Sequence, residues 1–267
     1  MFKAFFLFWR MRLIVSIIIF WGVSHVYAQS PQKIEQELLS SFRQLQYWAS
    51  SSTPGRIDSI KQANTTFRNS LLASTAAARS TFTYEFKELE KLGLVIRTAD
   101  DGLFRIYSWD TGMGGAEHNY DAVFQYRIET DVFSRLASHE AGETGKWYSH
   151  IYTLKTDTKT YYIGLFHEMF STTNLYQGVK FFCIQNKEIN ESVRLIKTAS
   201  GSTANEIGFA YNFLSVASRS ERPVKLIYYD TDDDRLHVTV VKNDGTVTKE
   251  VITYQFTGKY FEQMESR

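Results

Sequence analysis

The chain has 267 residues, with 30 lysines and arginines against 29 aspartates and glutamates. Residues 1–28 hold three of the basic residues and none of the acidic ones, so residues 29–267 have 27 basic and 29 acidic residues and a net charge of −2. Proteins that bind DNA or RNA neutralise phosphates with clustered positive charge, and the sequence has no dense basic patch. The composition therefore argues against a nucleic-acid partner.

The first 28 residues have the three parts of a secretory signal peptide. Positive charges at Lys3, Arg10 and Arg12 precede an apolar run at 13–23, and the small residue Ala28 ends the segment. A membrane-spanning helix needs about 20 apolar residues, and the two arginines keep the run shorter. We expect cleavage after Ala28, with a retained anchor as the alternative. Contact with a membrane is then expected only through the signal peptide before cleavage.

Residues 32–93 have helical periodicity, interrupted by the sequence SSTPG at 51–55. Apolar residues at steps of three and four mark three helices, whose predicted buried faces are Ile34, Leu38, Phe42 and Leu45; Ile57, Ile60, Ala63, Phe67 and Leu71; and Phe82, Phe86 and Leu89. The opposite faces are polar, so each helix is expected to pack through one side. Packing on a β-domain is favoured over a coiled coil with a partner, because the required heptads are missing.

From residue 94 onward the hydrophobic period changes to two. The predicted strands are 94–98, 103–109, 122–129, 147–154, 160–167, 178–185, 193–198, 206–213, 224–229, 236–242 and 246–256. Turn sequences at 100–102 and 243–245 predict hairpins. Pairs of adjacent aromatic residues, such as Tyr161-Tyr162 and Phe181-Phe182, point to opposite faces of a strand and indicate that both faces are covered. The only cysteine, Cys183, is expected to be a small buried core residue, so no internal disulfide supports the fold.

These patterns predict a mainly β protein with an N-terminal helical segment. The expected organisation is a signal peptide at 1–28, a helical segment at 29–93 packed on the β-domain, and an antiparallel β-domain at 94–267. Many short strands with short connections favour a meander that closes as a barrel or a sandwich. A propeller is a further alternative, although no residue signature repeats along the chain.

The densest group of polar residues and glycines is the segment DTGMGGAEH at 110–118. Asp110, Glu117 and His118 could converge there on a ligand, with Trp109 or Trp147 as a wall of the site. A plain glycine-bearing loop between two strands is the alternative. A phosphate-binding loop is excluded, because no Lys-Ser/Thr follows the glycines and no helix is predicted to begin there.

Other chemical signatures are incomplete. The pairs His139-Glu140 and His167-Glu168 lack the second histidine of a zinc protease helix. The acidic run at 230–234 lacks the glycine and glutamate of an EF-hand loop and is expected to be a hairpin tip. The sequence has no Gly-x-Ser-x-Gly motif. It therefore predicts no catalytic residue, no metal site and no cofactor.

Residues 101–110, DGLFRIYSWD, followed by Gly114-Gly115, resemble a segment of uncharacterised exported bacterial proteins. The resemblance covers about fifteen residues and implies a bacterial source and a location in the periplasm or at the cell surface. It supplies no activity and no residue roles.

Two classes of function remain. The favoured one is an exported, non-enzymatic binding domain or structural envelope domain, with an unknown protein, peptide or glycan as its partner. The alternative is a hydrolase of envelope or extracellular material. Whether the protein is an enzyme therefore stays open, and the sequence favours a protein without enzymatic activity.

Export itself is directly testable. When the full chain is expressed in a bacterial host, we predict a processed protein whose first residue is Gln29, measured by N-terminal sequencing of the periplasmic fraction. The variant Ile18→Arg, which interrupts the apolar run, should accumulate unprocessed in the cytoplasm, whereas Ile18→Leu should be exported normally. Recovery of protein that keeps Met1 in the membrane fraction would support the retained anchor.

Overall fold

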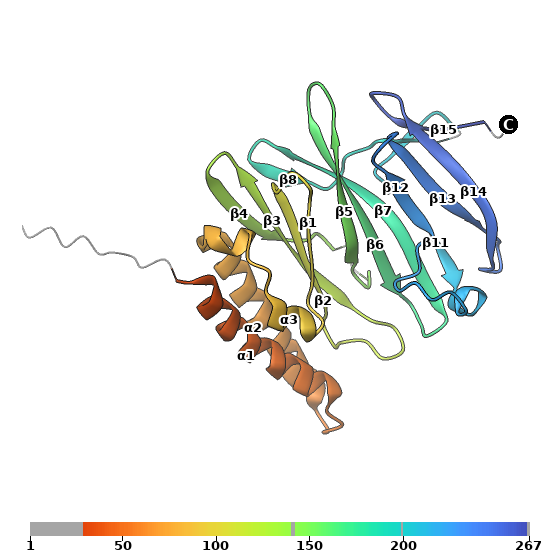
Figure 1. Cartoon of the computed structure of the whole chain (residues 1–267). Helices are drawn as coiled ribbons and strands as arrows, with labels where there is room; N and C mark the ends of the chain where they lie inside the picture. Colours follow the sequence, from red (N-terminus) through yellow and green to blue (C-terminus); the bar gives the residue numbers. More distant parts are fainter. Residues whose placement is uncertain (1–28, 140–141, 199, 266–267) are drawn as a thin grey trace, which may run out of the picture.

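A computed structural model describes residues 29–139, 142–198 and 200–265. The predicted signal peptide lies outside these residues. The described chain forms four layers, in which a helical layer covers the first of three stacked β-sheets (Figure 1). The protein is thus mainly β, with N-terminal helices and a sandwich-like stack of sheets, as the sequence predicts. No helix in the described residues is long and apolar enough to cross a membrane.

The helical layer is a hairpin of two long helices, α1 (Pro31–Ser50) and α2 (Arg56–Ala77). The Ser30 side chain accepts a hydrogen bond from the Lys33 amide and caps the start of α1. The apolar stripes of both helices pack against residues of the first sheet that include Tyr107 and Trp109. Ile57, predicted to lie on the buried face of α2, is instead 44% exposed in its first turn.

The prediction of a single third helix was wrong. The segment contains a short 3-10 helix, η1 (Arg79–Phe82), and one turn of α-helix, α3 (Lys87–Lys91). Phe86 separates the two with a positive φ of 51°, so its backbone leaves the helical conformation even though its side chain is buried. Because Phe82, Phe86 and Leu89 are all buried, their spacing imitates one helical face.

The three sheets are antiparallel except where β15 meets β9. The first sheet has the order β1-β2-β3-β4, with β1 (Val95–Thr98), β2 (Phe104–Asp110), β3 (Tyr120–Ile128) and β4 (Asp131–Leu136). The second sheet has the order β11-β7-β6-β5, with β5 (Trp147–Lys155), β6 (Thr160–Met169), β7 (Asn174–Gln185) and β11 (Glu206–Asn212); β8 (Glu188–Asn190) pairs with β7. The third has the order β10-β9-β15-β14-β13-β12, with β9 (Ile196–Lys197), β10 (Thr203–Ala204), β12 (Ile227–Asp230), β13 (Arg235–Val241), β14 (Val247–Phe256) and β15 (Phe261–Gln263).

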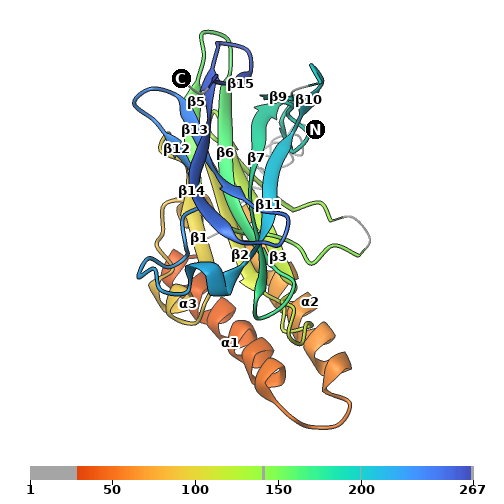
Figure 2. The same cartoon turned by 90° about the vertical axis from the view of Figure 1, so that its right-hand side faces the viewer.

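The second sheet lies between the other two, so both of its faces are buried. Phe182 faces the first sheet and contacts Phe104 and Phe124, whereas its neighbour Phe181 faces the third sheet and stacks on Phe261. This arrangement confirms what the paired aromatic residues indicated. Figure 2 looks onto β12–β14 with the strands of the second sheet behind them.

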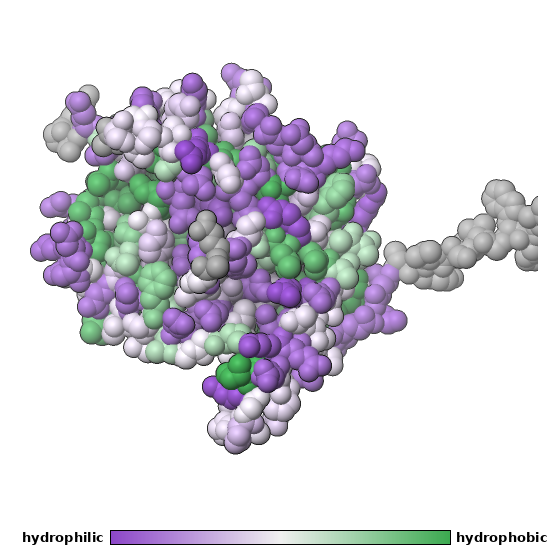
Figure 3. Space-filling model, turned by 180° about the vertical axis from the view of Figure 1, so that it is seen from behind, coloured by the Kyte–Doolittle hydropathy of each residue, from purple (hydrophilic) through white to green (hydrophobic). Residues whose placement is uncertain are grey.

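The outer surface is less uniform. On the rear face, apolar side chains gather on the side of the molecule where β11 to β14 lie (Figure 3). Over the rest of this face most side chains are polar. Ile207, Phe209, Tyr254 and Phe256 are only partly buried and pack against the core between the second and third sheets.

Most of the predicted strands form, including the hairpins at 100–102 and 243–245 and the acidic hairpin tip at 231–234. Cys183 is buried in β7, as predicted. Within the described ranges, the sequence prediction missed four strands, namely β4, β8, β10 and β15. Three of these have only two or three residues, too few to show a period of two, and β4 has no fully buried residue.

A buried glutamine joins the second sheet to the segment that leads into the third. Gln177 on β7 is fully buried, and its side-chain oxygen accepts hydrogen bonds from the amides of Leu226 and Ile227 at 2.7 and 2.6 Å. Its Nε2 donates to the carbonyl of Val224 at 2.8 Å. One side chain thus satisfies three buried backbone groups that precede or begin β12.

We predict that Gln177→Met destabilises the protein by at least about 3 kcal/mol, because it keeps the side-chain length but leaves three backbone groups unpaired at about 1–3 kcal/mol each. Urea unfolding would measure the difference. Gln185→Met, at the exposed end of the same strand, is the matched control and should change stability by less than about 0.5 kcal/mol. Equal effects of the two substitutions would contradict the role given to Gln177.

Candidate functional site

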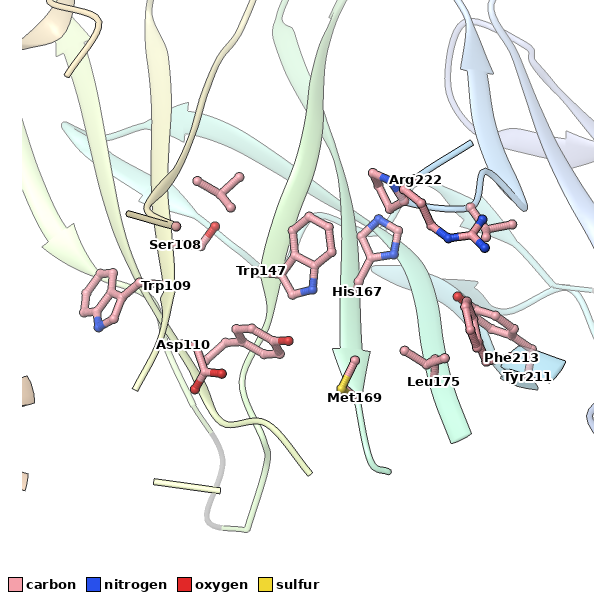
Figure 4. Close-up of a pocket in the computed structure, with 15 residues that line it drawn as sticks. Ser108, Trp109, Asp110, Trp147, His167, Met169, Leu175, Tyr211, Phe213 and Arg222 are labelled. Atoms are coloured by element: carbon pink, nitrogen blue, oxygen red, sulfur yellow. The ribbon is translucent and has the colours of Figure 1, made fainter. Parts of the chain in front are cut away.

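A cavity of about 360 Å³ lies where the ends of β2, β5 and β6 approach the segment before β12. Its walls are largely aromatic or apolar, and they include Trp147, His167, Met169, Leu175, Tyr211 and Phe213. Of the described residues that line it, Asp110 and Arg222 have charged side chains. In Figure 4, Trp147 and His167 lie side by side in the middle, with Asp110 toward one side and Tyr211 and Phe213 toward the other.

The centre of the cavity is a stacked pair of rings. The indole of Trp147 and the imidazole of His167 have centroids 4.3 Å apart and planes inclined by 17°. The two residues are register partners on β5 and β6, so the hydrogen bonds of the sheet fix their separation. A β-bulge between Tyr148 and His150 begins just after Trp147 and changes which faces the following residues of β5 point to.

The surroundings of His167 define its protonation. Its Nε2 lies 2.8 Å from Ser149 Oγ, and its Nδ1 lies 3.2 Å from the side-chain nitrogen of Gln177. Because Gln177 Nε2 can only donate, it requires a lone pair on Nδ1, and His167 then carries its proton on Nε2 and donates to Ser149. A second proton on Nδ1 would face a donor. Burial lowers the pKa of His167 to about 3, in agreement with this arrangement.

The tyrosines of the cavity are neutral as well. Burial raises the pKa of Tyr120 and of Tyr211 above that of a free tyrosine, so both keep their hydroxyl proton. Together with neutral His167, they leave the aromatic wall without charge.

Of the three polar residues that could converge in this loop, Asp110 and His118 contact each other. One oxygen of Asp110 contacts Nδ1 of His118, and the other accepts a hydrogen bond from the Gly112 amide at 2.8 Å. The amide of His118 donates to the carbonyl of Met169 at 3.0 Å, which attaches the loop to the end of β6. The ring of His118 also stacks on Tyr120, with centroids 6.2 Å apart. The carboxylate thus orients the imidazole.

Two glycines of this loop are required by close packing. A Cβ on Gly112, whose φ is 69°, would lie 2.5 Å from the Cβ of Ala49 on α1. A Cβ on Gly114 would lie 2.0 Å from the carbonyl oxygen of Glu117. Because neighbouring atoms occupy these positions, a larger residue at either glycine would force the loop out of its present conformation.

The structure brings some of the predicted site residues together and separates others. Asp110 and Trp147 line the cavity, and His118 is held beside Asp110. Glu117 is exposed and is not among the residues that line the cavity. Trp109 borders the cavity, but its indole points away from it (Figure 4) and donates to Asn64 of α2 at 2.8 Å. Its side chain thus belongs to the core under the helices rather than to a ligand wall.

Sequence reasoning missed the far wall of the cavity. Leu175, Tyr211, Phe213 and Arg222 come from β7, β11, η2 (Phe213–Val216) and the loop after it. The sequence carries a weak signal at His167, a histidine at the end of the predicted apolar strand 160–167. Nothing in the sequence marks the segment at 217–224.

A second cavity of about 190 Å³ adjoins the first and shares His167, Arg222, Pro223 and Val224 with it. Ser149 and His150 of β5 line its other side. The described residues contain no group of three or more histidine, cysteine, aspartate or glutamate side chains arranged to hold a metal ion.

The neutral state of His167 predicts a pH dependence of stability. The unfolded chain binds a proton at this residue near pH 6.5 and the folded protein only near pH 3, so the unfolded state binds more protons between these values. Stability is therefore complete above pH 6.5 and falls by about 1.4 kcal/mol per pH unit below it. In urea unfolding at pH 7.5 and pH 5.0, the wild type should lose about 2 kcal/mol more than His167→Gln. An equal loss in both proteins would show that His167 is protonated without penalty.

Comparison with known proteins assigns no family. No protein-family model matches the chain, and no curated protein matches it in sequence.

Proposed function

We propose that this protein is an exported, non-enzymatic binding protein whose ligand-binding site is the cavity around Trp147 and His167. The observation that carries the proposal is the cavity itself, with aromatic and apolar walls and a small number of placed polar groups. This composition is typical of sites for small molecules, and such sites have volumes of about 300–1,000 Å³. At about 360 Å³, the cavity fits a small molecule or one side group of a larger peptide or glycan.

The hydrogen bonds that hold the walls of the cavity support binding. His167 is held by Ser149 and Gln177, and the loop of Asp110 is held by its contacts with Gly112 and Met169. Preformed walls lower the ordering cost that a ligand must overcome. Export is supported by the signal-like sequence of residues 1–28 and places the ligand in the periplasm or outside the cell.

A hydrolase is the second candidate, and the contact between Asp110 and His118 is the observation that favours it. In many hydrolytic sites the general base is a histidine that a carboxylate orients. Such a site also needs a nucleophile, and no serine, threonine or cysteine side chain of the described residues hydrogen-bonds to His118. A water activated by His118 Nε2 is the remaining route to hydrolysis.

The binding proposal predicts that small aromatic compounds or aromatic-bearing peptides raise the melting temperature of the wild type, because a ligand at 100 times its Kd adds about 2.7 kcal/mol to stability. Trp147→Ala should lose this response. Tyr47→Ala is the matched control, since Tyr47 is 63% exposed on α1 and outside the cavity. Thermal-shift assays measure the change in melting temperature with a panel of such compounds, short peptides and oligosaccharides.

Two results would count against the proposal. If a compound stabilises Trp147→Ala as strongly as the wild type, the cavity is not its site. If a compound is cleaved by the wild type but not by His118→Ala, the protein is a hydrolase.

A further inference from the structure

We propose that the group bound in the cavity is a protonated amine attached to an aromatic or apolar body, with its amine on Asp110 and its body against Trp147. This inference rests on the proposed function and specifies the chemistry of its ligand.

The charged residues of the cavity are not equally available. Arg222 donates to the backbone carbonyls of Ala217, Arg219 and Glu221 at 2.9, 2.5 and 2.7 Å, and its guanidinium lies 5.2 Å from the ring centroid of Phe213. Three of its donors therefore hold its own loop. The side chain of Asp110 is 39% exposed, and its carboxylate receives one backbone amide and the contact with His118. A carboxylate offers about four acceptor positions, so Asp110 has capacity for a further donor.

The surroundings of Asp110 suit a cation. Among the described residues that line the cavity it is the only acidic one, and the aromatic rings of Tyr120 and Trp147 lie next to each other with centroids 6.4 Å apart. The faces of such rings attract ammonium groups. His167 on the other side of Trp147 stays neutral, since burial lowers its pKa to about 3, and it therefore does not repel a cation.

The body of the ligand meets an uncharged surface. Beyond Trp147, the wall continues through Met169, Leu175 and Tyr211. A ring or a branched chain of a few carbons buries apolar surface there, while its amine remains at the Asp110 end. A free arylalkylamine and the N-terminus of a peptide that begins with an aromatic residue share this chemistry.

The test compares three compounds of one shape by isothermal titration at neutral pH. They are 2-phenylethylamine, neutral 2-phenylethanol and anionic phenylacetate. We expect the amine to bind about 10- to 100-fold more tightly than the alcohol, as a charge-assisted hydrogen bond supplies, and phenylacetate to bind most weakly. Phe-Gly-Gly and its N-acetylated form separate the two sources of amine, and a preference for unacetylated Phe-Gly-Gly over 2-phenylethylamine would identify a peptide terminus.

Variants assign the preference to one residue. Asp110→Asn should lower the affinity for 2-phenylethylamine about 10-fold or more and leave that for 2-phenylethanol unchanged. Glu117→Gln removes an exposed acid of the same loop outside the cavity and should change neither affinity. If Asp110→Asn unfolds, the order of the three compounds on the wild type still decides.

The outcomes separate the two proposals. Equal affinity of the wild type for the three compounds, with loss of all three in Trp147→Ala, would overturn the amine preference and keep the cavity as a binding site. Tighter binding of phenylacetate would overturn it too and assign the charge selection to Arg222. Binding that is unaffected by Trp147→Ala would overturn both.

Discussion

The side-chain amide of Gln177 holds one wall of the site against β7, because it pairs with backbone groups of Val224, Leu226 and Ile227. The segment from Val224 to Ile227 lies against β7, while β12 pairs only with β13. The carbonyl of Leu226 pairs with the Thr239 amide of β13, whereas the carbonyl of Val224 and the amides of Leu226 and Ile227 pair with Gln177, which supplies both a donor and an acceptor. Nε2 of Gln177 also lies 3.2 Å from Nδ1 of His167. One residue thus holds the segment at 224–227, which begins at the cavity wall, and fixes the tautomer of His167.

From this constraint the uncharged character of the cavity follows. A histidine in an apolar wall is tolerated when its neutral form is fully hydrogen-bonded, and Ser149 and Gln177 provide that pairing for His167. Trp147 can then stack on a flat neutral ring instead of a cation. Among the described lining residues, Asp110 alone carries an acidic charge, and its accessible carboxylate already orients His118.

The parts of the fold that were predictable depend on local pattern. Asp244-Gly245 forms the turn between β13 and β14, and Phe181-Phe182 divides its rings between two cores, as alternation requires. The site was predictable only where one short segment supplies it, as at Asp110 and His118. Tyr211 and Arg222 reach the cavity through sheet stacking, which leaves no periodic trace in the sequence. Trp109 shows the converse, since an aromatic residue beside a polar loop turned toward α2 because strand alternation directs it there.

The loop at 110–118 shows why a polar cluster in sequence is a poor guide to a cluster in space. Gly112 packs on α1, and the amide of His118 pairs with Met169 on another strand. These two attachments turn the loop so that Asp110 and His118 meet. Glu117, one residue earlier, is turned out to solvent. If Asp110, Glu117 and His118 had all converged, hydrolysis would be the stronger hypothesis. A single oriented pair beside an aromatic cavity is better suited to recognising a charged group than to cleaving a bond, because binding needs only the carboxylate, whereas cleavage also needs a nucleophile and a place for the negative charge that develops.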